Sequence, residues 1–329
     1  METCCFANSS YRRYRFTSNF RDLLNGNGRI SISSALKEGY EFLKQKFNKY
    51  LELTKPKVTL LNLLVGVTCF VLAAFPTVNL LNLAMFSIIG YLSAGGCGVL
   101  NSVYDQDIDK LMARTSKRAI PSGKVSPKNG MGFGLLMIAA SVVFSYLFFN
   151  PLTVLMIGLG TAFYLVIYTV WLKRISSWNV VIGGFAGCFA GLSGWTAAAN
   201  TLSLMPLLVA TLGFLWTPGH LWALAIKKVK EYKSARIPML PVKVGINKAS
   251  KIVFLLNVFT VAFSLLFPLF QLTATAYLFV ALIAGGAFLF QNRGLFSASE
   301  VAGFKVFVAS MPYLTCLMLG LILDKLVLI

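Results

Sequence analysis

Nine apolar runs, each long enough to cross a lipid bilayer, constrain this chain more than any other feature of its sequence. A helix needs about 20 consecutive apolar residues to span the hydrocarbon core, and only helices and closed barrels satisfy their backbone hydrogen bonds there. The runs lie approximately at 58–76, 80–100, 131–149, 152–172, 178–199, 203–226, 251–270, 274–291 and 303–323. With 57% hydrophobic residues, the sequence predicts an all-α integral membrane protein, a bundle of nine transmembrane helices.

The positive charges fall in alternate loops. The formal net charge is +19, and Lys and Arg are concentrated before the first run and in the loops 101–130 and 227–251. The connections that contain neither residue lie near 77–79, 150–151, 200–202 and 271–273. By the positive-inside rule, we predict a multi-pass protein of the cell membrane with its N-terminus in the cytoplasm and its C-terminus outside. The charge therefore serves orientation in the lipid bilayer, and no nucleic acid partner is expected.

The N-terminal region differs in composition from the rest. It is polar and rich in Arg and Ser, and it has no apolar core of the kind found in secretory signals. Apolar residues recur at helical spacing across 36–53, which predicts an amphipathic helix at the membrane surface. We therefore divide the chain into a polar extension with an interfacial helix, partly disordered, at 1–45 and a nine-helix domain at 46–329. The alternative of an organellar transit peptide is disfavoured by Asp22, Glu38 and Glu41.

Acidic residues are rare in this chain and gather at one place. Only 11 Asp and Glu are present. Asn101, Asp105 and Asp109 are spaced four residues apart, so on a helix they share one face. Neighbouring carboxylates repel each other in a low-dielectric setting unless a cation binds them, and oxygen ligands suit Mg²⁺. The sequence therefore predicts a Mg²⁺ site. The alternative is a solvated loop with surface ion pairs.

Basic residues surround this acidic stretch. Arg114 and Arg118 follow it, and Lys173 and Arg174 end the fourth apolar run, so they predict a phosphate clamp. Lys173 and Arg174 have the alternative of a topology signal alone. Glu231 in the loop after the sixth run could complete a second cation site. A diphosphate head at the interface with a prenyl tail between helices would fit this arrangement, because ionisation then leaves a carbocation shielded from water.

The sixth run contains His220, the only histidine in the chain. Pro218 and Gly219 precede it and should break or kink the helix, which is tolerated where protein or a cavity surrounds the freed backbone. An ionisable side chain inside a span predicts a function. The alternative is a core histidine held by a hydrogen bond. The last three runs contain almost no polar side chains and are expected to be scaffold.

Several motifs together resemble the protohaem IX farnesyltransferase (haem O synthase) family of the intramembrane aromatic prenyltransferase superfamily. The matching segments are Lys55-Pro56-Lys57-Val58, Asn101-x3-Asp105-x3-Asp109 with Arg114-Thr115, Pro121-Ser122-Gly123, Tyr168-Thr169, Lys173-Arg174, Gly194-Trp195, Trp216-Thr217-Pro218-x-His220 and Ile237-Pro238-Met239-Leu240-Pro241-Val242. They run from about residue 50 to 245. The sequence departs from the family at Lys230-Glu231, where two adjacent acids are usual, and at Arg236, where Gly is usual.

The resemblance implies transfer of the farnesyl group of farnesyl diphosphate to a vinyl group of haem B, which gives haem O. It implies Mg²⁺ as cofactor and haem B as substrate, with contact to a downstream haem-modifying enzyme or oxidase assembly. His220 would lie on the haem side, as an iron ligand or a propionate partner. The expected residues are as follows: catalytic, Asp105, Asp109 and His220; substrate-binding, Asn101, Arg114, Arg118, Lys173, Arg174 and Trp216; metal-binding, Asn101, Asp105, Asp109 and Glu231. The alternatives are a prenyltransferase acting on a quinone precursor or a glycerophosphate lipid, and a transporter.

Overall fold

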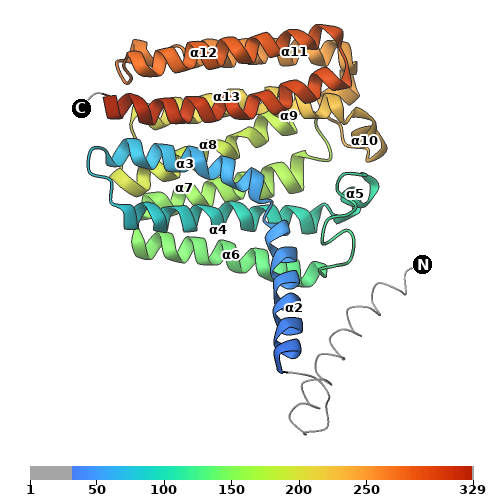
Figure 1. Ribbon diagram of the computed structural model, residues 1–329. Helices are drawn as coiled ribbons and strands as arrows, with labels where there is room; N and C mark the ends of the chain where they lie inside the picture. The colour runs from blue at the N-terminus through green and yellow to red at the C-terminus, as the bar shows by residue number, and fades with distance from the viewer. Residues whose placement is uncertain (1–31, 328–329) are drawn as a thin grey trace, which may run out of the picture. The chain divides into compact units, whose positions relative to one another are not determined.

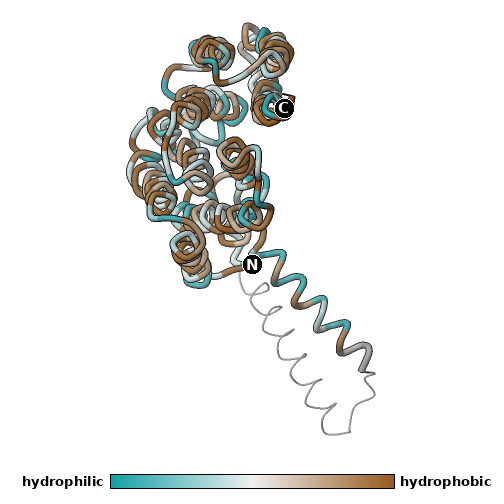
Figure 2. The backbone as a smooth tube through the Cα atoms, turned by 90° about the vertical axis from the view of Figure 1, so that its left-hand side faces the viewer, coloured by the Kyte–Doolittle hydropathy of each residue, from teal (hydrophilic) through white to brown (hydrophobic). Residues whose placement is uncertain are grey.

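The computed structural model describes residues 32–327, and within them every regular element is a helix (Figure 1). Nine helical segments there are long and apolar enough to cross a membrane, which confirms the predicted bundle. The helices are α3 (Pro56–Ala74), α4 (Leu80–Tyr104), α6 (Pro127–Phe148), α7 (Pro151–Ala162) with the π-helix η1 (Phe163–Leu172), α8 (Asn179–Ala199), α9 (Leu204–Lys227), α11 (Leu240–Ser264) with the 3₁₀ helix η2 (Phe267–Phe270), α12 (Thr275–Asn292) with the 3₁₀ helix η3 (Arg293–Ser297), and α13 (Glu300–Val327). Apolar residues dominate them (Figure 2).

Two short helices outside the spans lie at one end of the bundle (Figure 1). They are α5 (Gln106–Leu111) and α10 (Val229–Ser234). The last turn of α13 lies at the opposite end. The acidic stretch and the loop that contains Glu231 are therefore on the same side of the protein, as the alternation of charged loops predicts.

Polar caps and prolines fix where several spans begin. The side chain of Asn79 accepts backbone hydrogen bonds at the start of α4, and those of Ser126 and Asn150 do so before α6 and α7. Pro127 and Pro151 then occupy the first turn, where a missing N–H costs nothing. The start fixed by Asn79 helps to set the rotation of α4, whose other end carries Asn101 and leads into Asp105.

Close backbone contact holds the centre of the bundle together. The main pairs of packed helices are α4 with α6, α3 with α8, α8 with α7 and α9, α9 with α11 and α13, and α12 with α13. At the crossing of α3 and α8, a Cβ atom on Gly194 would lie 1.9 Å from the carbonyl oxygen of Gly66. No side chain fits at that distance, so glycine at position 194 allows these two backbones to touch.

Pro218 does not interrupt α9, which runs unbroken from Leu204–Lys227. The predicted break in this span is therefore absent. Proline removes one backbone donor, and neighbouring helices compensate for such a loss inside a membrane protein. Gly219 serves packing, because a Cβ atom there would lie 2.0 Å from Oδ1 of Asn257 in α11.

The last three spans contain more buried polar groups than the sequence suggested. Asp324 is 0% exposed, and its carboxylate accepts hydrogen bonds from the backbone N–H groups of Ala274 (2.6 Å) and Tyr277 (2.9 Å) at the start of α12. Asn257 donates to Asn292 at 2.6 Å, which joins α11 to the end of α12. These contacts are structural, in agreement with a scaffold role, but periodicity did not reveal them.

The amphipathic helix predicted over 36–53 is present as α2 (Ile32–Leu53). Leu36, Tyr40, Leu43 and Phe47 are 63–70% exposed along it, and hydrophilic and hydrophobic residues alternate (Figure 2). The chain forms two compact units, Met1–Glu52 and Leu53–Ile329, so the predicted boundary at 45/46 falls inside α2. The polar tail predicted before α2 lies outside the described residues, and attachment of α2 to the membrane surface stays a prediction.

Candidate active site

Asn101, Asp105 and Asp109 form one buried group, which we call the acid cluster. Their exposed fractions are 4%, 1% and 6%. Asn101 lies in the last turn of α4, Asp105 lies at the junction with α5, and Asp109 lies within α5. Backbone hydrogen bonds from Asp105 N to Asn101 O (2.9 Å) and from Asp109 N to Asp105 O (2.8 Å) continue the helical spacing through the junction. The side chains are therefore gathered on one face and are not a solvated loop.

Three cations neutralise the acid cluster. Lys173 forms an ion pair with Asp105, and Arg118 donates to Asp109 at 3.1 Å. Lys55 donates from Nζ to Oδ1 of Asn101 at 2.6 Å. Two carboxylates and three basic side chains leave an excess of positive charge when Lys55 is protonated, which favours the binding of an anion such as a diphosphate.

Sequence analysis did not assign Lys55 to the site. It precedes Pro56 at the start of α3 and has a left-handed backbone (φ 52°), a strained conformation for a residue other than glycine. Burial lowers the pKa of Lys55 to about 7, and the nearby charges of Arg118 and Lys173 add to this effect. The Lys55-Pro56-Lys57 motif was the available signal, but its distance of about 45 residues from the acidic stretch concealed the contact.

The π-helix η1 orients the amide of Asn101. Thr169 in η1 donates its hydroxyl hydrogen to the carbonyl oxygen of Tyr164, five residues earlier, at 2.8 Å. The hydroxyl oxygen can then accept from Nδ2 of Asn101 at 3.1 Å. The same Nδ2 donates to Asp105 at 2.8 Å. With Nδ2 engaged twice, Oδ1 of Asn101 must face Lys55. Departures from α-helical spacing often lie at functional sites, and Thr169 is a second residue that sequence analysis missed.

The oxygen atoms of the site suit a hard metal ion. Oδ1 of Asp105 is buried without a hydrogen-bond partner, and so is Oε2 of Glu231. A buried oxygen without a partner is costly unless something binds it. Among the described residues, no group of three or more His, Cys, Asp and Glu side chains could hold a metal by itself. A metal at the acid cluster would therefore depend on the amide of Asn101 and on oxygens of a bound ligand, as is usual for Mg²⁺.

The other predicted residues lie around this centre in different ways. Glu231 in α10 pairs with Lys228 at 2.6 Å, and it makes no ion pair or hydrogen bond with the acid cluster of the described structure. Arg174 binds Asp107 through two hydrogen bonds of 2.8 Å, which hold the pKa of Asp107 below its usual value. Arg114 is exposed in the loop that follows α5. The structure thus brings Lys173 and Arg118 to the acids, and it directs Arg174 elsewhere.

His220 lies in a separate aromatic group between α9 and α13. Its ring stacks on Trp216 with centroids 4.1 Å apart and packs against Phe307 at 4.5 Å. Nδ1 of His220 is 2.6 Å from the hydroxyl of Ser310, and Trp216 donates to the carbonyl oxygen of Ser310 at 2.9 Å. Trp216 and His220 are each 8% exposed. Among the described residues, none of the contacts of these two rings is with the acid cluster.

Residues 60–313 match the model of the UbiA prenyltransferase family. A solved structure described as digeranylgeranylglyceryl phosphate synthase has a TM-score of 0.69 and 19% identity, and the match covers 85% of this chain and 99% of that one. A UbiA homolog from Archaeoglobus fulgidus bound to GPP and Mg²⁺ has a TM-score of 0.65 and 16% identity, over 83% and 99% of the two chains. The chain belongs to the UbiA prenyltransferase family.

The curated relatives of this chain share one name within the family. Protoheme IX farnesyltransferase 1 from Pseudomonas fluorescens is 40% identical over 276 residues, which are 84% of this chain and 92% of that protein. Protoheme IX farnesyltransferase from Neorickettsia sennetsu is 39% identical over 277 residues, 84% and 91% of the two proteins. Protoheme IX farnesyltransferase 1 from Cenarchaeum symbiosum is 37% identical over 280 residues, 83% and 94%. Relatives of one activity from bacteria and archaea therefore match this chain over most of its length.

Proposed function

We propose that this protein is a haem O synthase, which transfers the farnesyl group of farnesyl diphosphate to a vinyl group of haem B. The observation that carries the proposal is the buried acid cluster with its three cations, in a chain whose curated relatives are protoheme IX farnesyltransferases. An acceptor such as a quinone precursor would need no counterpart to the aromatic group around His220. A transporter would not need buried acids and cations joined in closed pairs.

The chemistry follows from the charges at the acid cluster. Bound Mg²⁺ would be held by oxygens of Asp105, Asp109 and Asn101 and would supply charge neutralisation for the diphosphate. Lys55, Lys173 and Arg118 would hold the diphosphate and stabilise the charge that builds up as its bond to the farnesyl carbon breaks. Since the surrounding helices are apolar, they exclude water from the allylic carbocation.

The acceptor step then forms the new bond. The farnesyl cation would be attacked by a vinyl carbon of haem B, and water would capture the cation left beside the porphyrin ring to give the hydroxyl group of haem O. We propose His220 and Trp216 as haem-side residues. Because Nδ1 of His220 is engaged by Ser310, Nε2 is the nitrogen available to a haem iron or a propionate.

The direct test is product formation. Membranes that contain the protein should convert haem B and farnesyl diphosphate to haem O in the presence of Mg²⁺, detected by mass, and chelation of the metal should stop the reaction. Asp105→Asn and Asp109→Asn should each lose activity without loss of folded protein, because one anionic ligand is removed. Glu300→Gln is the matched control, since Glu300 lies 3.8 Å from Lys227 and Lys230 and outside the site. Full activity of Asp105→Asn would overturn the assignment.

His220→Ala separates the two substrates. We expect this variant to raise the KM for haem B more than the KM for farnesyl diphosphate, because the aromatic group has no contact with the acid cluster. An equal rise in both KM values, accompanied by a lower melting temperature, would mean that His220 only packs α9 against α13.

A further inference from the structure

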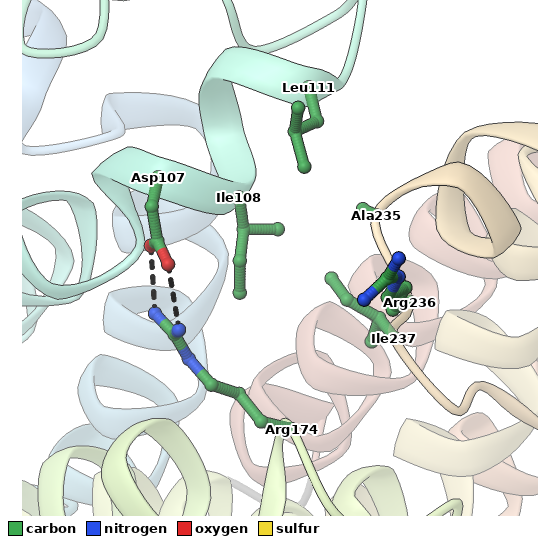
Figure 3. Close-up of a pocket in the computed structure, with 7 residues that line it drawn as sticks. All are labelled: Asp107, Ile108, Leu111, Arg174, Ala235, Arg236 and Ile237. Carbon is green, nitrogen blue, oxygen red and sulfur yellow. Dashed lines mark hydrogen bonds and ion pairs between the residues drawn. The ribbon is translucent and has the colours of Figure 1, made fainter.

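A pocket of about 260 Å³ lies beside the acid cluster (Figure 3). We call it the Arg236 pocket. It is open to the surface on one side and is lined by α5, by the turn after η1 and by the loop after α10. The lining residues that matter here are Asp107, Ile108, Leu111, Arg174, Ile237 and the exposed Arg236. Its two guanidinium groups differ. Arg174 is bound by Asp107, whereas the guanidinium of Arg236 points into the pocket and has no ion pair with any described residue.

The backbone at Arg236 is strained. Its φ angle is 55°, in the left-handed region, which glycine adopts freely and residues with a Cβ atom adopt at a cost. The strain alone assigns no function, because Gln271 and Ala298 share this backbone. What distinguishes Arg236 is that its side chain lines the pocket.

The walls of the pocket define the ligand. Ile108 and Ile237 are buried at 7% and 2% exposure, and Leu111 is 62% exposed at the rim. A free guanidinium presents a planar pair of donors that matches a carboxylate. The ligand should therefore have an apolar body and an oxyanion end. Pockets that enclose a whole drug-sized ligand have about 300–1,000 Å³, so this smaller one holds only the anionic end.

The pocket adjoins the reaction centre but does not duplicate it. The neighbouring residues Lys173 and Arg174 point to different sites, since Lys173 contacts Asp105 and Arg174 contacts Asp107. Likewise Asp109 of α5 belongs to the acid cluster, and Asp107 of the same helix belongs to the pocket. The diphosphate of the donor is already provided with three cations at the acid cluster. The anion left for Arg236 is therefore that of the acceptor.

We propose that the Arg236 pocket binds a carboxylate of the acceptor, which for haem B is a propionate. This inference rests on the proposed function. One propionate fixed beside α5 would orient the porphyrin relative to the farnesyl cation, so Arg236 would select acceptors that carry a carboxylate beside an apolar ring.

The test compares Arg236→Gly with wild-type full-length protein in nanodiscs of neutral lipid. The dissociation constant of haem B is measured by absorbance titration without farnesyl diphosphate, and both KM values are measured from haem O formation. We expect the variant to bind haem B about tenfold more weakly, as for the loss of a charge-assisted hydrogen bond, with the KM for farnesyl diphosphate unchanged. Because glycine relieves the strained backbone, its melting temperature should equal or exceed that of wild type.

The dimethyl ester of haem B provides the decisive comparison, because it lacks the carboxylate charges. Wild type should bind the ester about as weakly as Arg236→Gly binds haem B, and the substitution should not weaken ester binding further. Lys233→Ala is the matched control, an exposed cation three residues away that does not line the pocket, and it should behave as wild type.

Three outcomes would overturn the proposal. Unchanged haem affinity in Arg236→Gly would remove the role of the guanidinium. A rise confined to the KM for farnesyl diphosphate would assign the pocket to the donor diphosphate. An effect that appears only in nanodiscs with anionic lipid would assign it to a lipid headgroup. Failure of wild type to form haem O while it still binds haem B through Arg236 would refute the proposed reaction and leave the carboxylate site standing.

Discussion

At the scale of single residues, the site depends on which polar atoms already have partners. Lys55, Lys173 and Arg118 each bind one member of the acid cluster. Each therefore has a specific partner and is not a general surface charge. Lys55 is distinctive because it reaches Asn101 from the start of another helix. The left-handed backbone at Lys55 has its counterpart at Arg236, and both cations lie beside the same stretch of α4 and α5.

Lys55→Ala should raise the KM for farnesyl diphosphate by about tenfold or more, because a charge-assisted contact worth about 1.5–3 kcal/mol is lost. The affinity for haem B should change little. Steady-state kinetics with each substrate varied in turn measures both effects. Lys57→Ala is the control, since Lys57 is exposed and only two residues away. Loss of the same size in both variants would indicate a general effect of surface charge.

At the scale of helices, η1 and α12 illustrate two uses of buried polar groups. Thr169 of η1 holds the amide of Asn101 in one orientation, and Asp324 of α13 holds the first turn of α12. The first arrangement concerns the site. The second concerns stability, because Asp324 satisfies backbone donors that a helix start leaves without partners.

Thr169→Val should weaken metal binding at the acid cluster by about tenfold, the lower end for the loss of a group that supports a metal ligand. Valine has a similar shape but cannot accept from Nδ2 of Asn101. The affinity for Mn²⁺, measured by electron paramagnetic resonance with farnesyl diphosphate bound, reports this directly. Thr169→Ser keeps the hydroxyl and should restore the affinity. If serine fails to restore it, packing of the methyl group matters and hydrogen bonding does not.

Asp324→Ala should lower the free energy of unfolding by about 1–3 kcal/mol, because two backbone N–H groups lose their acceptor inside the protein. Thermal unfolding in detergent measures the change. Asp324→Asn retains one acceptor oxygen and should be less destabilised. Neither substitution should alter the KM values of the protein that remains folded, and a selective effect on one substrate would give Asp324 a functional role.

At the scale of the whole molecule, the orientation of the protein determines on which side of the membrane the acid cluster lies. We propose that the N-terminus, α5 and α10 face the cytoplasm and that the end of α13 faces outside, because Lys and Arg avoid the opposite connections. Both substrates would then reach the acid cluster from the cytoplasmic surface.

Cysteine labelling tests the orientation. In sealed right-side-out vesicles, a maleimide that cannot cross the membrane should label Thr201→Cys and not Lys124→Cys, and both residues are exposed. Permeabilised vesicles should label both, and the unsubstituted chain gives the background. The reverse pattern would invert the topology and place the acid cluster outside.

The sequence predicted the spans and the acid cluster because each has a local period. The length of each apolar run matches the thickness of the bilayer. The helical spacing of Asn101, Asp105 and Asp109 continues across the junction between α4 and α5. Lys55 and Thr169 could not be predicted in the same way, because their contacts join segments 46 and 68 residues from Asn101. Of the break or kink expected at Pro218, the break is absent, since α9 runs unbroken through this residue.

The π-helical geometry of η1 also sets the directions of Lys173 and Arg174 in the turn that follows it. Lys173 donates its backbone N–H to the carbonyl oxygen of Tyr168, five residues earlier, so the wider winding extends to the last residue before Arg174. An α-helix of equal length would turn both side chains to other angles about the helix axis. The winding of this segment thus sets which of two consecutive cations faces Asp105 and which faces Asp107.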